Sequence, residues 1–201
     1  MMETGTHTRT ASLEAGPALF ATLRVRNVVG SARVAGSLRL DDLAAAIPGA
    51  TLDPTGRRLV LRLAAPKATA LVFGSGKVVL TGLRAPGAAV PALEAVLALL
   101  RAAGAALDEP VPAPTIVNLV ASGTLGGKVA LHRLAISRNL DRIEFDPEQF
   151  PGLVYRSVAG GVALVFGTGS VIVTGTPSLE GARAVAAEVQ AVVTGAGALL
   201  A

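Results

Sequence analysis

The sequence predicts an α+β protein built on one continuous antiparallel sheet of about ten strands, with helices on one face and the other face open. Short stretches of alternating apolar and polar residues, separated by turn signals, indicate the strands. Each group of strands is followed by a longer helical pattern, and the whole arrangement occurs twice. With 201 residues, 51% of them hydrophobic, the chain has enough apolar material for one large or two small domains.

The repeat is clearest where TALVFGSGKVVLTG (69–82) is followed 93 residues later by VALVFGTGSVIVTG (162–175). Offsets of 91 to 94 residues also relate Asn27 to Asn118, Asp53 to Asp146 and Arg62 to Arg156, and small insertions in turns explain the drift. The predicted organisation is an N-terminal extension expected to be mobile (1–19), a first repeat (20–106), a Pro-rich linker (107–114), a second repeat (115–194) and a C-terminal tail (195–201).

Each repeat is predicted to run strand, helix, four short strands, helix. In the first repeat, 23–31 alternates as a strand, and 38–47 has helical spacing with Ser37 as a candidate N-cap. Residues 57–63, 69–73 and 77–81 follow as antiparallel strands. The closing helix, 91–103, tolerates Pro91 only in its first turn. In the second repeat, 115–122 matches the first strand and 178–193 is the closing helix.

Composition excludes several classes of protein. There is no cysteine, so disulfides and Cys-ligated zinc are excluded, and two distant histidines do not suggest a metal site. No apolar run approaches the ~20 residues needed to span a bilayer, and the N-terminus lacks an apolar signal core, so we expect a soluble intracellular protein without a membrane partner. FGSGK lacks the flanking residues of a phosphate loop, and no catalytic constellation falls at repeat-matched positions, so an enzyme is not expected.

The net charge of +4 is unevenly distributed. Residues 20–106 hold 11 Lys+Arg and 4 Asp+Glu, whereas residues 112–193 hold 6 of each. A polyanion such as DNA would be attracted mainly to the first repeat. Surface arginines that only keep an apolar protein soluble would give the same count.

Two of the five phenylalanines, Phe150 and Phe166, lie at strand ends beside turn signals. A ring at a strand end usually belongs to the core, but it can also be a contact residue. The segments around these rings, VNLVAS, EFDPEQFPGLVYR and LVFGTGSVIVTG, strongly resemble the TATA-binding proteins of archaea and eukaryotes. VRNVVGS and LVFGSGKVVLTG resemble the first repeat of the same family, and the likeness covers about residues 22–193 in the right order.

The resemblance implies a saddle-shaped sheet with its helices on the convex face and its open concave face against DNA. Such a protein binds and bends A·T-rich, TATA-like promoter DNA from the minor groove, where A·T steps offer few distinguishing polar groups. It recruits an initiation factor of the B type and, through it, RNA polymerase. No cofactor is implied, and the expected location is the cytoplasm, with the nucleoid, in a prokaryote or the nucleus otherwise.

The residues that the resemblance places against DNA fall into three groups. Asn27 and Asn118 would donate to base acceptors, although an amide bonded to backbone is the alternative for each. Phe150 and Phe166 would wedge open a base step, with Phe73 left from a first-repeat pair. The surrounding face is expected to consist of Val29, Leu71, Val79, Thr81, Val120, Leu164, Ile172 and Thr174. Phosphate contacts are expected at Arg62, Lys77, Arg156 and Ser170.

The first repeat departs from the family pattern. The family carries two wedging phenylalanines per repeat, but the position six residues before Arg62, matching Phe150 before Arg156, is Gly56. The loop TGRR, with a basic tip at Arg57-Arg58, replaces EQFPG. This predicts a weaker kink at that end, compensated by phosphate attraction.

The second-repeat loop keeps residues that in the family dock the basic initiation factor: Glu144, Phe145, Glu148 and Gln149. The helical face is poor in charge, so self-association through an apolar patch is an alternative use of it. The main alternative function is a divergent saddle-shaped module that binds protein or nucleic acid without TATA-specific bending. A metabolite-sensing domain would need a convergent polar cluster, which the sequence does not show.

Overall fold

The computed structural model describes residues 19–136 and 140–200. The predicted N-terminal extension therefore lies outside the described residues, except for Leu19. Both halves of the described chain follow the order predicted from the repeat, although several boundaries shift by one or two residues.

The first half starts with a short helix and ends with a long one. Its elements are α1 (Leu19–Thr22), β1 (Arg24–Arg33), α2 (Leu40–Ala46), β2 (Thr51–Leu52), β3 (Arg58–Leu63), β4 (Ala68–Phe73), β5 (Lys77–Leu83), the 3-10 helix η1 (Pro86–Ala88) and α3 (Ala89–Ala102). The second half consists of β6 (Thr115–Thr124), β7 (Lys128–Val129), α4 (Leu131–Ala135), the 3-10 helix η2 (Leu140–Arg142), β8 (Ile143–Glu144), β9 (Gly152–Arg156), β10 (Val162–Phe166), β11 (Ser170–Thr176), α5 (Leu179–Gly195) and β12 (Leu199–Leu200).

Ten strands form one antiparallel sheet in the order β2-β3-β4-β5-β1-β6-β11-β10-β9-β8. The first strands of the two halves, β1 and β6, pair at its centre, so the sheet is continuous and has approximate twofold symmetry. A separate two-stranded sheet pairs β7 with β12. Of these two strands, β12 lies in the segment predicted as the C-terminal tail. The predicted α+β class and single sheet of about ten strands are confirmed.

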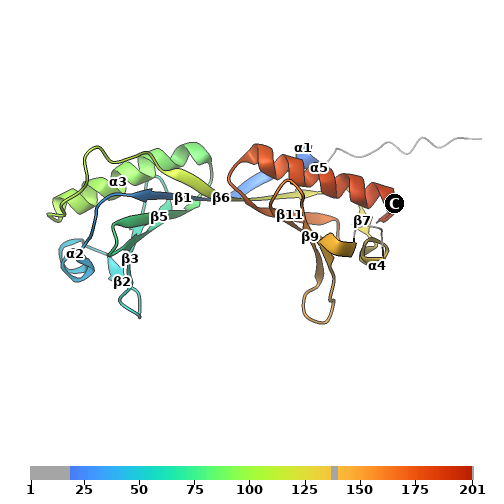
Figure 1. Ribbon diagram of the computed structural model, residues 1–201, viewed down its shortest axis with the longest axis horizontal. Coiled ribbons are helices and arrows are strands. Elements are labelled where there is room, and N and C mark those ends of the chain that lie inside the picture. The colour runs from blue at the N-terminus through green and yellow to red at the C-terminus, as the bar shows by residue number, and fades with distance from the viewer. Residues whose placement is uncertain (1–18, 137–139, 201) are drawn as a thin grey trace, which may run out of the picture.

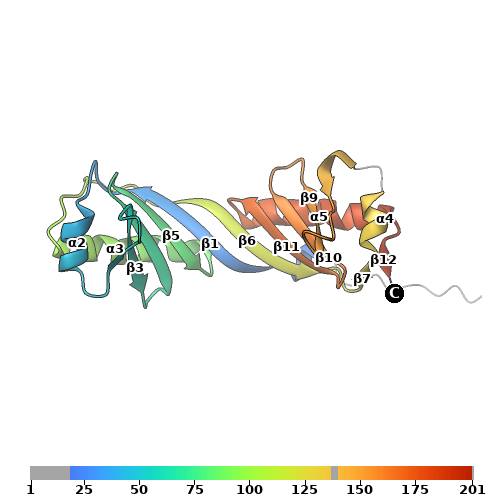
Figure 2. The ribbon, with the colours of Figure 1, turned by 90° about the horizontal axis from the view of Figure 1, so that it is seen from below.

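The long helices α3 and α5 lie along one face of the sheet, and the outer strands of both halves bend away from them (Figure 1). The loops after β2 and β8 hang from the two ends like stirrups, while α2 and α4 lie at the outer ends of the molecule. Seen from below, the twisted strands lie in front of both long helices (Figure 2). The sheet is therefore a saddle whose concave face is open.

Alternation along the strands produces the two faces. In β1 the side chains of Val28 and Ala32 are buried against the helices, whereas Asn27, Val29 and Ser31 are half-buried on the other face. The same two-residue period recurs in β3, β4, β5 and in β9, β10, β11. The core therefore lies between the sheet and the helices.

Two helix starts show how local contacts decide boundaries. The Ser178 hydroxyl accepts from the backbone N–H of Gly181 at 3.0 Å and caps α5. The prediction of Ser37 as the cap of α2 is wrong, since Arg39 holds that position without a side-chain bond. The Leu38 N–H donates to the Gly74 carbonyl at 2.8 Å, which keeps the chain extended past Ser37.

The first described residues, in α1, pack against the second half of the molecule. Leu19 is fully buried, and its N–H donates to the side chain of Gln190 on α5 at 3.0 Å. The Thr22 hydroxyl and the Thr124 N–H are 2.9 Å apart. A Cβ at Gly123 would lie 2.7 Å from that hydroxyl, so glycine is needed for α1 to dock. Across 19–136 and 140–200, no helix is both long and apolar enough to cross a membrane.

Candidate nucleic-acid interface

Strand register assembles the open face into two matching rows that cross five strands each. Neighbours in each row face each other across adjacent strands, and their side chains share the concave face. The rows are Val60-Leu71-Val79-Ser31-Thr115 and Val154-Leu164-Ile172-Ser122-Arg24. The structure thus brings the predicted Leu71, Val79, Leu164 and Ile172 to one surface.

Sequence reasoning missed several members of these rows. Val60 and Val154 are half-buried and extend the apolar surface toward the outer strands, while Ser31 and Ser122 are polar members of the rows on the central strands β1 and β6. Alternation within β3 and β9 was the signal that could have identified the two valines. The predicted Thr81 and Thr174 also lie on this face, because they follow Val79 and Ile172 by two residues on β5 and β11.

The two asparagines meet at the centre of the saddle. Asn27 pairs with Val120, and Val29 pairs with Asn118, so two amides and two valines surround the approximate twofold axis on one face. The Gly82 N–H donates to Asn27 Oδ1 at 2.8 Å, and the Gly175 N–H donates to Asn118 Oδ1 at 2.9 Å. A backbone N–H can only donate, so these bonds fix which amide atom is the oxygen.

Each amide nitrogen faces a threonine hydroxyl. Asn27 Nδ2 lies 3.5 Å from Thr81 Oγ1, and Asn118 Nδ2 lies 3.3 Å from Thr174 Oγ1. An amide NH2 carries two hydrogens, and one long contact uses at most one of them. The amides are therefore anchored to backbone through oxygen and still present a donor to the concave face.

The rings of Phe150 and Phe166 pack against each other at the end of the second half. Their centroids are 5.7 Å apart with an interplanar angle of 64°, an edge-on contact. Gly152 pairs with Phe166, and a Cβ there would lie 2.7 Å from Phe150 Cε1 and 3.1 Å from Phe166 Cε1. Both rings are half-buried. They lie on the sheet side and not among the helices.

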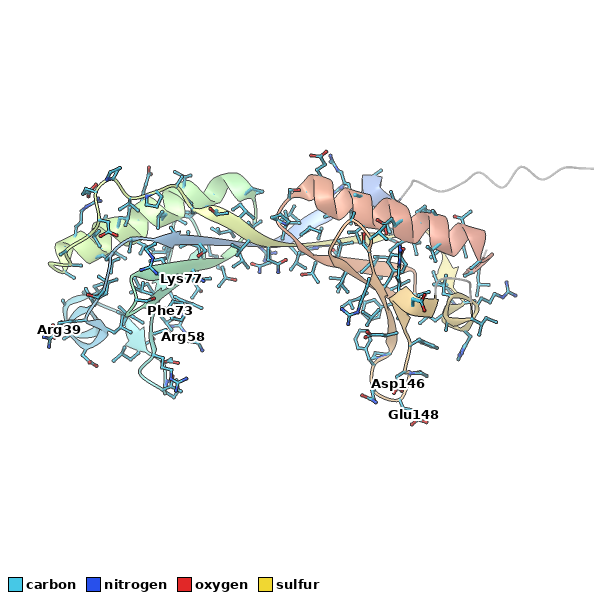
Figure 3. All side chains as sticks on the ribbon, in the orientation of Figure 1. Arg39, Arg58, Phe73, Lys77, Asp146 and Glu148 are labelled. Atoms are coloured by element: carbon cyan, nitrogen blue, oxygen red, sulfur yellow. The ribbon has the colours of Figure 1, made fainter. Side chains whose placement is uncertain are left out.

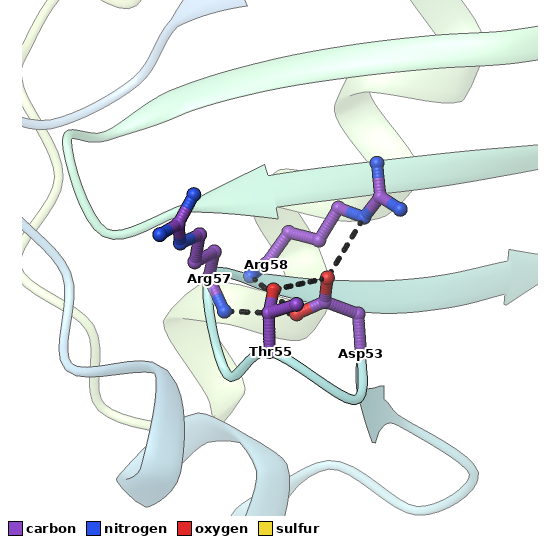
Figure 4. Close-up of polar contacts among 4 residues, drawn as sticks. All are labelled: Asp53, Thr55, Arg57 and Arg58. Carbon is purple, nitrogen blue, oxygen red and sulfur yellow. Dashed lines mark hydrogen bonds and ion pairs between the residues drawn. The ribbon is translucent and has the colours of Figure 1, made fainter.

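The first half has a different construction at the equivalent place. Phe73 is half-buried as predicted, but its cross-strand partner is Arg58. The loop before Arg58 is organised around the Asp53 carboxylate, which accepts from the N–H groups of Arg57 at 2.8 Å and Arg58 at 3.2 Å and from the Thr55 hydroxyl at 2.8 Å (Figure 4). The Thr55 hydrogen bond, helped by the backbone of Arg58 and Arg57, holds the pKa of Asp53 below its usual value.

The predicted cationic contacts differ between the halves. Arg62 and Lys77 are exposed, and Lys77 pairs with Arg33 at the start of β5. Arg156 is also exposed, but its Nε and a terminal nitrogen lie 3.0 and 2.9 Å from Glu144 Oε1. Ser170 is exposed at the start of β11. Arg156, which was predicted to contact phosphate, therefore pairs with Glu144, which was predicted to contact the initiation factor.

A hollow of about 440 Å³ lies beside Phe166. It is lined in part by Arg24, Arg26 and Ser122, and the Arg26 Nε donates to the Ser122 hydroxyl at 2.7 Å. Neither arginine was expected from the sequence. Their matched residues in the second half are Thr115 and Val117, so these cations break the symmetry of the face.

The acidic loop of the second half is ordered by its own side chains. Asp146 accepts from the Glu148 N–H at 3.1 Å and from the Gln149 amide at 2.8 Å. Phe145 is half-buried and meets the ring of His132 on α4 edge-on at 5.2 Å. Asp146 and Glu148 lie at the tip of the loop, on the opposite half from Arg58, Phe73 and Lys77 (Figure 3).

The convex face also carries the apolar exposure expected from the sequence. Val90 and Leu99 of α3 are 47% and 36% exposed. Self-association through this face stays a prediction.

Comparisons with known proteins agree with this construction. The family model described as transcription factor TFIID (or TATA-binding protein) matches residues 22–103 and 113–195, one segment in each half. TATA-box-binding protein F of Halobacterium salinarum is 41% identical over 156 residues, covering 77% of this chain and 83% of that protein. The TATA-box-binding protein of Archaeoglobus fulgidus is 40% identical over 164 residues, covering 80% and 88%.

A solved structure gives the same result in three dimensions. The Methanococcus jannaschii TATA-binding protein superposes with a TM-score of 0.76 at 33% sequence identity, covering 87% of this chain and 99% of that one. The family segments begin just before β1 and β6, the strands that carry the paired asparagines. The chain described here belongs to the TATA-binding protein family.

Proposed function

We propose that this chain binds A·T-rich, TATA-like promoter DNA through its concave face, bends it from the minor groove, and takes part in transcription initiation. The single observation that carries the proposal is the centre of the saddle. Two amides with fixed orientation, Asn27 and Asn118, lie among apolar side chains on one continuous face. Donors among apolar groups suit the minor groove of A·T pairs, which shows acceptors and no donor.

The bending step is assigned to the ring pair at the second end. Phe150 and Phe166 are in edge-on contact at the rim of the open face, and inserting apolar side chains between base pairs is a known way to kink a duplex. The first half offers Phe73 alone beside Arg58. The second half is therefore expected to produce the sharper kink.

Bound-DNA bending on a TATA-containing duplex tests this assignment. Phe150→Ala should reduce both the bend angle and the affinity more than Phe73→Ala does. Phe145→Ala is the matched control, since that ring packs against His132 and not on the open face. Equal effects of Phe150→Ala and Phe73→Ala would refute the asymmetry, and an unbent duplex in the wild-type complex would refute the bending itself.

Recruitment of the B-type initiation factor is assigned to the tip of the acidic loop. Glu148 is exposed there, whereas Glu144 is engaged with Arg156. Glu148→Lys should weaken binding of the factor to the protein–DNA complex in a gel shift while leaving DNA affinity unchanged. Glu94→Lys, an exposed charge reversal on α3, is the control. Loss of factor binding in both variants would remove the assignment to this loop.

A binding module without TATA-specific bending remains the second candidate, because the first half lacks its ring pair. Competition between A·T-rich and G·C-rich duplexes at fixed salt separates the two functions. A preference of tenfold or less, on the order of a single base-pair mismatch, would favour the non-specific module.

A further inference from the structure

The two halves present different chemistry at one equivalent position of the concave face. In the second half, Gly152 lies across from Phe166, and the absence of a Cβ makes room for the ring of Phe150. In the first half, Arg58 lies across from Phe73. An arginine side chain therefore occupies the place that a second wedge takes in the other half.

Arg58 is held in position by the loop that precedes it. Its Nε lies 3.4 Å from Asp53 Oδ2, and its backbone N–H donates to Asp53 Oδ1 at 3.2 Å. The Asp53 N–H in turn donates to the Arg58 carbonyl at 3.0 Å. The side chain is 46% exposed, and the contact with Asp53 uses Nε, so the terminal nitrogens extend beyond it. A guanidinium fixed in this way loses little conformational freedom when it binds.

Charge around the two loops points in the same direction. Arg57, Arg58 and Arg62 lie in or after the first loop, and Lys77 lies at the start of β5, two strands away from β3. The second loop carries Asp146 and Glu148 at its tip. The tip of the first loop is therefore attracted to the negative potential of a duplex, and the acidic tip of the second loop is repelled by it.

We propose that Arg58 replaces the missing wedge with an electrostatic contact in a narrow minor groove, so that the two ends of the saddle select different DNA. This inference rests on the proposed function. A-tracts are stiff, and their narrow minor groove attracts arginine, whereas TA and CA steps kink easily. The preferred site is then directional, with an A-tract under Arg58 and a flexible pyrimidine–purine step under Phe150 and Phe166.

Orientation on DNA can be measured because the chain has no cysteine. Ala64→Cys, an exposed position in the turn between β3 and β4, gives a unique donor-dye site in the first half. The DNA is a duplex with an A-tract at one end and a TA step at the other, carrying an acceptor dye at either end. Energy transfer should place the first half at the A-tract end, and exchanging the two sequence blocks should reverse the result.

Arg58→Gln removes the charge while keeping similar length. We expect about tenfold weaker binding to the directional duplex, the loss of one charge-assisted contact, and near-equal populations of the two orientations. Arg58→Lys should retain most of the orientation preference. Arg39→Gln is the matched control, since Arg39 is an exposed arginine at the N-cap of α2 that pairs with Asp42. Thermal unfolding of each variant verifies that the fold is kept.

Three results would overturn the inference. First, the wild type could bind the A·T-rich duplex equally in both orientations. Second, Arg58→Gln could have the same DNA affinity and orientation preference as Arg39→Gln. Third, Arg58→Gln could lose the same affinity for an A-tract as for an alternating sequence of equal A·T content. Each of these leaves the proposed function intact if A·T-rich DNA is still preferred over G·C-rich DNA. Absence of that preference in the wild type would instead reject the proposed function together with the inference.

Discussion

Replacing Gly152 by alanine should impair DNA bending without unfolding the protein. The new Cβ would lie 2.7 Å from Phe150 Cε1, whereas ordinary contacts are 3.4–4 Å, so the ring must move by roughly 1 Å. The clashing atom is at the end of a side chain, and an off-rotamer ring costs about 0.5–1.5 kcal/mol. The reduced entropy of the unfolded chain offsets about 0.4–1 kcal/mol of this.

The net change in the free energy of unfolding is therefore near zero, and the melting temperature should stay within about 3 °C of the wild type. DNA bending depends on both rings meeting the same base step, so we expect roughly tenfold weaker binding and a smaller bend angle. Calorimetry and a bending assay on one TATA-containing duplex measure the two effects separately. Gly74→Ala is the control, because its Cβ would meet the Leu38 carbonyl oxygen at an ordinary 3.5 Å. Unchanged bending in Gly152→Ala, or a loss of several kcal/mol in stability, would contradict this account.

Three further changes have expected outcomes. Asn118→Asp keeps an oxygen for the Gly175 N–H but replaces a donor with a negative charge, so DNA affinity in a gel shift should fall by about 2 kcal/mol or more while the melting temperature holds. Gly76→Ala puts a Cβ 1.7 Å from a backbone carbonyl oxygen at a φ of +76°, and thermal unfolding should show a loss of about 3 kcal/mol or more. The pKa of Asp53 in the folded protein lies below its usual 3.8. The ionised carboxylate therefore stabilises the fold above pH 3.8, and this stabilisation is lost as the pH falls through the pKa of the folded state. In Thr55→Val, NMR titration should show the pKa of Asp53 rising toward 3.8.

The architecture was predictable because two independent signals agreed. Alternation identified the strands and their faces, and the repeat required both halves to have the same fold. Matching Asn27 with Asn118 across the repeat placed both on the central strands, and the register confirms that they share one face. Family membership, predicted from the motifs in both repeats, is confirmed by the comparisons.

What the sequence did not reveal depends on contacts between distant residues. Ser37 looked like a helix cap, but a backbone bond from Leu38 to Gly74 overrode it. Gly152 ends the loop segment EQFPG, and its role in accommodating the Phe150 ring follows only from the cross-strand pairing with Phe166. Pairing of distant side chains is set by tertiary structure, for which one sequence gives no local signal.

The path of the chain before β1 links the halves more tightly than a linker between domains would. Fragment 19–106 begins by inserting Leu19 against α5, then passes through the middle of the sheet before building its own half. Cleavage within 107–114 would therefore leave two pieces that still interlock. Apart from each other, each piece would expose a ten-residue strand edge, which invites aggregation. The two repeats are therefore expected to fold only together, as one structural unit.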